Sequence, residues 1–151
     1  MEDSKETIEF WKQKRDEIGK EIILKSFVRF IGESGKGQYD LSGLLYASEE
    51  RVYFEDFEKS SMFDFLIKKS KKQYEKFTMN FLVSDTSEIR KVSESSAIAC
   101  AEGAIEKAKK PGIIDSLLKS TIWEISFKDG YSYFFEIFES KELVKLINNE
   151  Q

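Results

Sequence analysis

No histidine, one cysteine and one proline occur among the 151 residues, and each shortage excludes a class of chemistry. Histidine is the commonest general base, the usual activator of serine and cysteine nucleophiles, and a frequent metal ligand. Cys100, as the only cysteine, can form neither an intrachain disulfide nor a cysteine-based zinc site. We therefore predict a protein that is not an enzyme, has no cofactor or metal, and lies in the reducing cytoplasm.

Long apolar runs are also missing from the chain. No stretch approaches the length needed to cross a bilayer, and the charged first 19 residues lack the apolar centre of a signal peptide. The net charge of -4 and the pI near 5.1 argue against a nucleic-acid binder, which needs a basic face. Because 40% of the residues are hydrophobic, with 13 phenylalanines, we predict one folded, soluble domain over residues 1–151.

Residues 1–19 are predicted to form a helix. Asp3 and Glu6 stand at the spacing of a capping box, and Gly19 is suited to end the helix. One helical stripe should pack on the domain: Ile8, Trp11, Arg15 and Ile18. We interpret this segment as a packing helix in preference to a partner-binding one.

Alternating apolar residues predict strands between residues 22 and 138. A β-branched and aromatic run over 21–31 precedes a glycine-rich break, and residues 39–57 are typical of a hairpin with its turn at 48–51. A further strand is predicted over 77–83. These segments together predict a β-rich domain.

The segments between these strands are less regular. Residues 60–76 interrupt the alternation and are predicted as an insertion, either a loop or a short helix. A second capping-box spacing begins at Asp85 and predicts one short helical turn around Ile89 and Val92.

A long connection is predicted over residues 103–120. Before it, Ser96–Ala101 is small and apolar enough for a short strand, in which Cys100 is expected to be a buried small hydrophobe. Within it, Ala104–Lys109 is predicted as a brief helical patch that stops before Pro111.

The last hairpin is the clearest part of the sequence. A two-residue loop of Asp129 and Gly130 would set Trp123 opposite Glu136, whereas a three-residue loop sets Trp123 opposite Phe135. The longer loop keeps one face apolar and puts the glycine at a left-handed bulge position, so we predict it. A helix over 140–149 is predicted to follow, with Ser140 as its N-cap and one apolar face formed by Leu143, Leu146 and Ile147.

Three stretches resemble GRAM domains and bacterial pleckstrin-homology-like (PH-like) domains. Leu41–Phe54 is similar to their glycine, strand, polar turn and Arg-apolar-x-Phe hairpin, Leu82–Val92 resembles a short connector, and Ile125–Phe135 resembles their closing hairpin. The resemblance implies a mainly β (α+β) fold. It would be a partly open antiparallel β-barrel or sandwich of about seven strands with a C-terminal capping helix and an extra N-terminal helix.

Phosphate binding is not expected near the first hairpin. Gly32–Gly37 invites a P-loop interpretation, but Phe30 stands where that motif needs glycine and no Ser or Thr follows Lys36, so a hairpin turn is predicted. Pleckstrin-homology domains that bind phosphoinositides hold the phosphate groups with several closely placed cations around the first hairpin. The same region supplies Lys25, Arg29 and Lys36 without that tight spacing.

Carboxylates gather in the second hairpin and just after it. These residues are Glu49, Glu50, Glu55, Asp56 and Glu58. Strand alternation is expected to send most of them to solvent, so they predict neither an acid–base pair nor a hard-metal site.

The functional hypothesis centres on residues 62–76. Apolar side chains precede a run of lysines there, a combination that can attach to an anionic membrane, although apolar residues that cover the barrel beneath solvated lysines would give the same pattern. The candidate lipid- or partner-binding residues are Phe63, Phe65, Lys68, Lys69, Lys71, Lys72 and Lys76.

We predict a non-catalytic binding or adaptor module whose partner is another protein. The partner would dock on an exposed strand edge or in a groove beside residues 60–76. Peripheral binding to an anionic membrane through residues 62–76 is the alternative, and no nucleic-acid partner is expected.

Overall fold

The structure is a computed structural model, and it describes residues 4–57, 77–113 and 122–149. The described residues form seven strands, three α-helices and a 3-10 turn. The strands are β1 (Leu24–Glu33), β2 (Gly37–Ala47), β3 (Arg51–Asp56), β4 (Thr78–Leu82), β5 (Thr86–Val92), β6 (Ile122–Phe127) and β7 (Ser132–Ile137). The helices are α1 (Lys5–Ile18), α3 (Glu94–Ala101) and α5 (Lys141–Asn149), and the 3-10 turn is η1 (Val83–Asp85).

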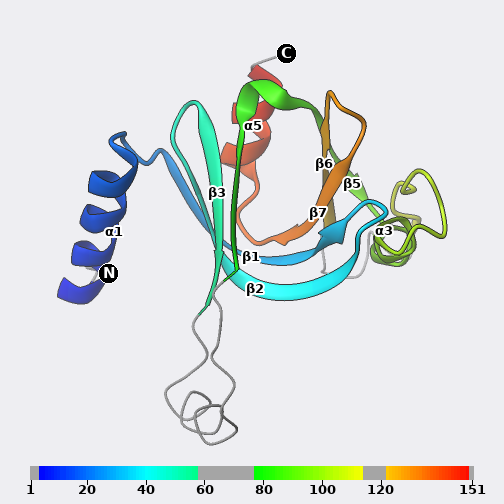
Figure 1. Ribbon diagram of the computed structural model, residues 1–151, viewed down its shortest axis with the longest axis horizontal. Coiled ribbons are helices and arrows are strands. Elements are labelled where there is room, and N and C mark those ends of the chain that lie inside the picture. Colours follow the sequence, from blue (N-terminus) through cyan, green and yellow to red (C-terminus); the bar gives the residue numbers. More distant parts are fainter. Residues whose placement is uncertain (1–3, 58–76, 114–121, 150–151) are drawn as a thin grey trace, which may run out of the picture.

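All seven strands belong to one antiparallel sheet with the order β4-β3-β2-β1-β7-β6-β5. The sheet curls into a half-barrel, which Figure 1 shows with α5 over one end. The turn η1 joins the two edge strands, β4 and β5, and α5 packs against both η1 and β5. The mainly β fold predicted from the sequence is therefore confirmed.

The main core lies on the inner face of the half-barrel. Phe30 is 1% exposed, and its ring lies 5.0 Å from that of Phe135 and 5.7 Å from that of Phe54. From α5, Leu143 and Ile147 are fully buried against this core, as their shared helical face predicts. Burial of these side chains holds α5 against the inner face of the sheet.

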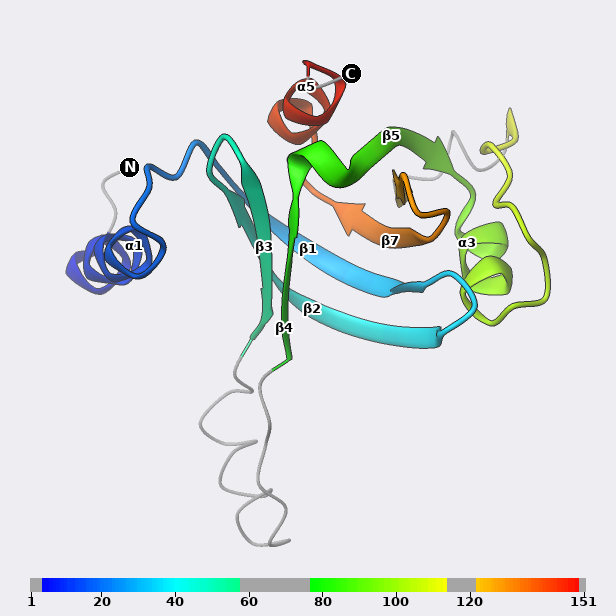
Figure 2. The same cartoon turned by 45° about the horizontal axis from the view of Figure 1, so that its top comes forward.

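The outer face of the sheet carries the other two helices at opposite sides (Figures 1 and 2). α3 covers a second buried cluster that contains Ile31, Val92, Ile122 and Phe134. α1 lies beside β2 and β3, where its Trp11 ring meets Tyr46 edge-on at 5.5 Å. None of the residues of α1 is buried.

The predicted hairpins agree with the structure. β2 and β3 pair with Leu45 opposite Phe54, and β6 and β7 pair with Trp123 opposite Phe135, the register of the three-residue loop. Gly130 has a φ of 96° and its amide donates to the Phe127 carbonyl. The left-handed bulge predicted at this glycine is confirmed.

The predicted cap of the first helix is wrong by one residue. Ser4 is the N-cap, since its hydroxyl accepts a hydrogen bond from the Thr7 amide at 3.1 Å, where the sequence suggested Asp3. Gly19 ends the helix with a φ of 69° and donates its amide to the Arg15 carbonyl, as predicted.

Two predictions for the connecting segments are wrong. The short helical turn predicted around Ile89 and Val92 is part of strand β5, whose residues Thr86, Ile89 and Val92 are buried where it pairs with β6. Ser96–Ala101, predicted as a strand, lies in α3, whose N-cap Ser93 accepts from the Ser96 amide. Its small side chains let the helix approach the sheet closely.

The helical patch predicted over Ala104–Lys109 does not form. The Lys109 amide donates to the Ser96 hydroxyl at 2.9 Å, and the Lys109 carbonyl accepts from the Ser93 amide at 2.8 Å. Contacts with α3 thus replace the intrahelical bonds that the pattern suggested. The inserted residues 60–76 and residues 114–120 of the long connection lie outside the described residues.

Candidate functional site

The residues predicted as a binding site cannot be placed in the fold. Phe63, Phe65, Lys68, Lys69, Lys71, Lys72 and Lys76 all lie outside the described residues, and so does the predicted groove beside them.

The glycine-rich segment Gly32–Gly37 is the turn between β1 and β2, as predicted. Three successive amides are already bonded: Ser34 donates to the Ser132 carbonyl, Gly35 to the Cys100 carbonyl and Lys36 to the Glu33 carbonyl. Amides engaged in this way cannot cradle a phosphate.

Two of the three cations near the first hairpin are engaged as well. Arg29 contacts three carboxylates, with its guanidinium 3.0 Å from Asp40, 2.6 Å from Glu94 and 3.5 Å from Glu136. The Lys25 ammonium lies 4.5 Å from the centre of the Trp11 ring. The structure therefore does not gather these groups into an anion site.

A groove of about 730 Å3 opens where β1 begins. Its two walls are residues 22–25, at the start of β1, and residues 138–142, at the start of α5. The groove exists because β1 pairs with β2 from Leu24 onward but with β7 only from Val28 onward. The chain after β7 then turns away to form α5 and leaves the first residues of β1 uncovered on that side.

Exposed aromatic rings border this groove. Phe27 is 61% exposed and Phe138 is 68% exposed, and the Phe138 amide donates to the Phe27 carbonyl at 3.2 Å, which sets the two residues side by side. Phe57 extends the row, since its ring centre lies 5.8 Å from that of Phe27. Exposed apolar groups gathered in this way usually mark a binding surface.

A smaller hollow of about 200 Å3 adjoins the groove beneath α1. Ile8, Trp11 and Arg15 line it from the helix. Glu21, Ile22 and Lys25 line it from the chain after the helix, and the last two also line the groove. Ile8 is 56% exposed, although the sequence predicted it on the packing stripe with Trp11. Only part of the predicted stripe of α1 is covered.

These apolar groups form one surface around residues 19–23, the linker between α1 and β1. We call this surface the linker face and define it by Ile8, Ile23, Phe27, Phe57 and Phe138, each more than 40% exposed. Shared lining residues join the two hollows along it.

Polar contacts hold α1 at the border of the linker face. The Lys14 ammonium lies 2.9 Å from the Glu55 carboxylate, which also accepts a hydrogen bond from the Tyr46 hydroxyl at 3.1 Å. Burial alone would lower the pKa of Lys14, but the hydrogen bond and charge of Glu55 outweigh it, so the pKa is raised. Burial and the nearby Glu55 charge both raise the pKa of Tyr46.

The expectation that the hairpin carboxylates face solvent is wrong for Glu55 and Asp56. Both are only 5% exposed, because α1 covers Glu55 and Asp56 accepts a hydrogen bond from the Phe77 amide at 3.1 Å. Among the described residues, no three acidic, histidine or cysteine side chains are grouped so as to hold a metal ion.

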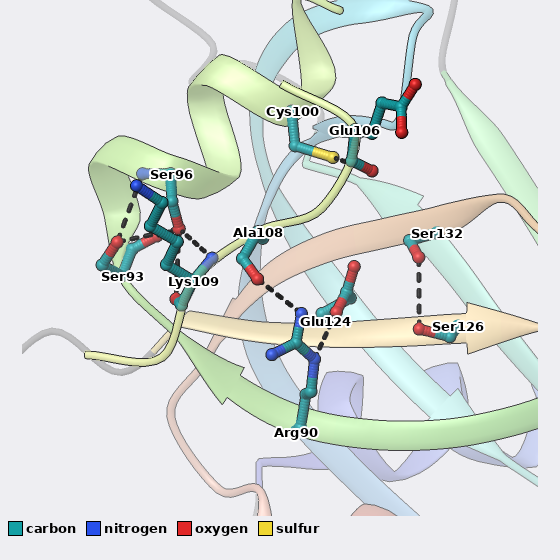
Figure 3. Close-up of polar contacts among 10 residues, drawn as sticks. All are labelled: Arg90, Ser93, Ser96, Cys100, Glu106, Ala108, Lys109, Glu124, Ser126 and Ser132. Carbon is teal, nitrogen blue, oxygen red and sulfur yellow. Dashed lines mark hydrogen bonds and ion pairs between the residues drawn. The ribbon is translucent and has the colours of Figure 1, made fainter. Parts of the chain in front are cut away.

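The α3 side of the outer face is closed by polar contacts, which Figure 3 shows. Arg90 contacts Glu124 at 2.7 Å and donates to the Ala108 carbonyl at 2.6 Å. The Cys100 thiol, buried as predicted, lies 3.6 Å from the Glu106 carbonyl, and burial raises its pKa. Residues 105–111, which we call the strap, are thereby fixed across the sheet.

The strap and the residues that follow it expose basic and apolar side chains. Ala108 points inward and is 2% exposed, whereas Lys107, Lys109 and Lys110 of the strap are exposed to solvent. Ile113 follows and is 85% exposed. Within the described part of the chain, none of the three lysines forms an ion pair.

No helix in the described part of the chain is long and apolar enough to cross a membrane. No model of a known protein family matches the sequence, and no curated protein is similar to it.

Proposed function

We propose that this protein is a non-catalytic binding module whose linker face docks a protein partner. The observation that carries the proposal is the gathering of exposed apolar side chains around one groove. Phe27, Phe138 and Ile23 contribute from two segments more than 100 residues apart, so the surface is a product of the fold. Core positions of protein interfaces are enriched in such aromatic residues.

A PH-like identity for the domain belongs to the same proposal. It is supported by the curled antiparallel sheet, by the order in which the strands pair, and by α5 over one end. Folds of this kind carry many functions, so the argument for binding rests on the linker face alone.

The charges beside the groove favour a protein over a membrane as the partner. Two lysines and two glutamates line the groove, which gives no excess of positive charge to attract anionic headgroups. Lys25 among them is already placed over Trp11. An apolar centre with a rim of both signs has the composition of a protein interface.

Selection of binders from a random peptide library displayed on phage tests the proposal. Peptides rich in apolar residues should be enriched on the immobilised protein. The double variant that combines Phe27→Asp and Phe138→Asp should no longer bind them. Ile113→Asp serves as the matched control, because this exposed residue lies outside the linker face. Equal binding to the double variant, or no enrichment on a protein that is monomeric, would contradict a docking role for this face.

A second candidate function is peripheral binding to an anionic membrane. The observation that favours it is that the strap carries three lysines, none of which forms an ion pair with another described residue, next to the exposed Ile113. The segment 105–113 contains Glu106 as its single carboxylate, so its charge is 3 - 1 = +2 in a chain of net charge -4. Each such lysine attracts an anionic surface by about 1 kcal/mol.

Flotation with vesicles tests this second function. Vesicles that contain phosphatidylserine should carry the protein, purely zwitterionic vesicles should not, and reversal of Lys107, Lys109 and Lys110 to glutamate should end flotation. Reversal of Lys5 and Lys12, which are exposed on α1, is the control. Flotation that survives the strap variant but falls on reversal of Lys68, Lys69, Lys71 and Lys72 would move the membrane contact to residues 62–76.

A further inference from the structure

We infer that the partner which the linker face fits is a second copy of this chain, in a two-fold symmetric dimer. The inference rests on the proposed function, because it names the partner of the same surface. Two properties of the linker face carry it: the face has both a projection and a hollow, and its charges are balanced in sign.

A two-fold interface uses the same patch on both protomers, so whatever projects from the patch must fit a recess in that same patch. The linker face meets this condition. Helix α1 projects from the sheet beside the linker (Figure 1), with Ile8 exposed on it, and the groove of about 730 Å3 lies across the linker. The projecting helix of one protomer can therefore enter the groove of its partner while the reverse contact forms.

The incomplete packing of α1 agrees with this arrangement. A helix whose apolar stripe is satisfied within its own domain would bury that stripe. Here α1 buries no residue, Ile8 remains 56% exposed, and a hollow of about 200 Å3 separates Ile8 from Ile22. A second protomer would cover the part of the stripe that the first leaves open.

The groove carries charges of both signs, so it can form complementary contacts with the same groove of a second copy. Lys141 lies beside Glu139 and Glu142 on one wall, and none of the three forms an ion pair with another described residue. A partner of strongly basic or acidic character would meet like charges on this wall. A second copy presents both signs in return, which satisfies electrostatic complementarity.

Sedimentation equilibrium of the full chain, from micromolar to millimolar concentration, tests the inference. The wild-type protein should show a reversible monomer–dimer equilibrium. Ile8→Asp and Phe138→Asp should each weaken the dimer by at least about tenfold, the loss expected at the centre of an interface. Ile113→Asp, the control outside the linker face, should leave the dimer unchanged, and far-UV circular dichroism should show that every variant is folded.

Charge exchange gives a second, independent arm. Lys141→Glu should weaken self-association, and Lys141→Glu with Glu142→Lys should restore it, because the double variant keeps both signs on the wall. A chain that stays monomeric at every concentration overturns the inference, and so does a dimer that only Ile113→Asp disrupts.

The dimer and the proposed function can fail separately. A monomeric protein whose selected peptides still need Phe27 and Phe138 would retain the docking function and lose only the second copy as partner. A monomeric protein that also enriches no peptide would lose both.

Discussion

The two helices on the outer face of the sheet cover it to different degrees. α3 is eight residues long and buries Ser96, Ala97, Cys100 and Ala101, whereas α1 is 14 residues long and buries none. The strap closes the α3 side through contacts to Arg90, Ser93 and Ser96, while the α1 side keeps two hollows and a row of exposed rings. The difference separates a half of the outer face that is closed from a half that leaves apolar side chains exposed, and we propose that the open half binds a partner.

The largest expected effect comes from a comparison of two phenylalanines that lie four residues apart, Phe134 in the half covered by α3 and Phe138 on the linker face. Substitution of Phe134, which is 0% exposed beneath α3, by alanine should lower the free energy of unfolding by about 3–5 kcal/mol. The same substitution of Phe138, which is 68% exposed, should lower it by less than about 0.5 kcal/mol. Urea denaturation at low protein concentration measures both. Equal losses would remove the distinction between the two halves.

Arg90→Met is the next test and probes the closed half alone. It leaves the Glu124 carboxylate, 5% exposed, without its cation and releases the Ala108 carbonyl, so we expect a loss of about 3 kcal/mol. Denaturation by urea measures the loss, with Arg51→Met as a control at a more exposed contact to Asn80. A loss no larger than the control's would mean that the strap is not fixed by Arg90.

A smaller and local effect is expected from Lys14→Met. Removal of this cation from the buried Glu55 should weaken docking of α1 by about 1–2 kcal/mol and leave the sheet intact. Trp11 fluorescence in a Trp123→Phe background should shift toward that of an exposed indole. Lys12→Met, exposed on the same helix, is the control, and an identical spectrum for both variants would contradict the role of the ion pair.

The pH dependence of α1 docking gives the smallest effect. Because the folded-state pKa of Lys14 lies above its ordinary value of 10.5, its contribution is complete below pH 10.5 and is lost as pH rises through the folded pKa. The raised pKa of Tyr46 acts in the same direction, since the folded state disfavours the phenolate. Trp11 fluorescence should therefore report undocking only at alkaline pH. In Lys14→Met the alkaline change should be reduced, and a change of full size in that variant would assign it to another group.

The parts of the fold that follow from local pattern could be predicted from the sequence. Gly130 and the alternation around Trp123 and Phe135 set the β6–β7 register, and the spacing of Leu143 and Ile147 gives the buried face of α5. α3 was missed because its small residues carry no clear helical period, and its stability comes from Ser93 and the sheet beneath it.

The candidate site was missed because its parts meet only in the folded chain. The burial of Glu55 depends on Lys14, 41 residues earlier, and the groove joins residues 22–25 to residues 138–142. One signal was present in the sequence: Phe27 stands between Lys25 and Arg29 at alternate positions, which places an aromatic ring on the polar face of β1. An exposed aromatic residue at such a position favours a surface that contacts another molecule.

The most direct test of the central claim is amide hydrogen exchange of the full chain at low and high protein concentration. We predict that protection at high concentration rises in residues 8–27 and 138–142 and stays constant in α3 and the strap. Protection that is independent of concentration everywhere, or that rises in α3 instead, would contradict the assignment of the linker face as the surface that binds a partner.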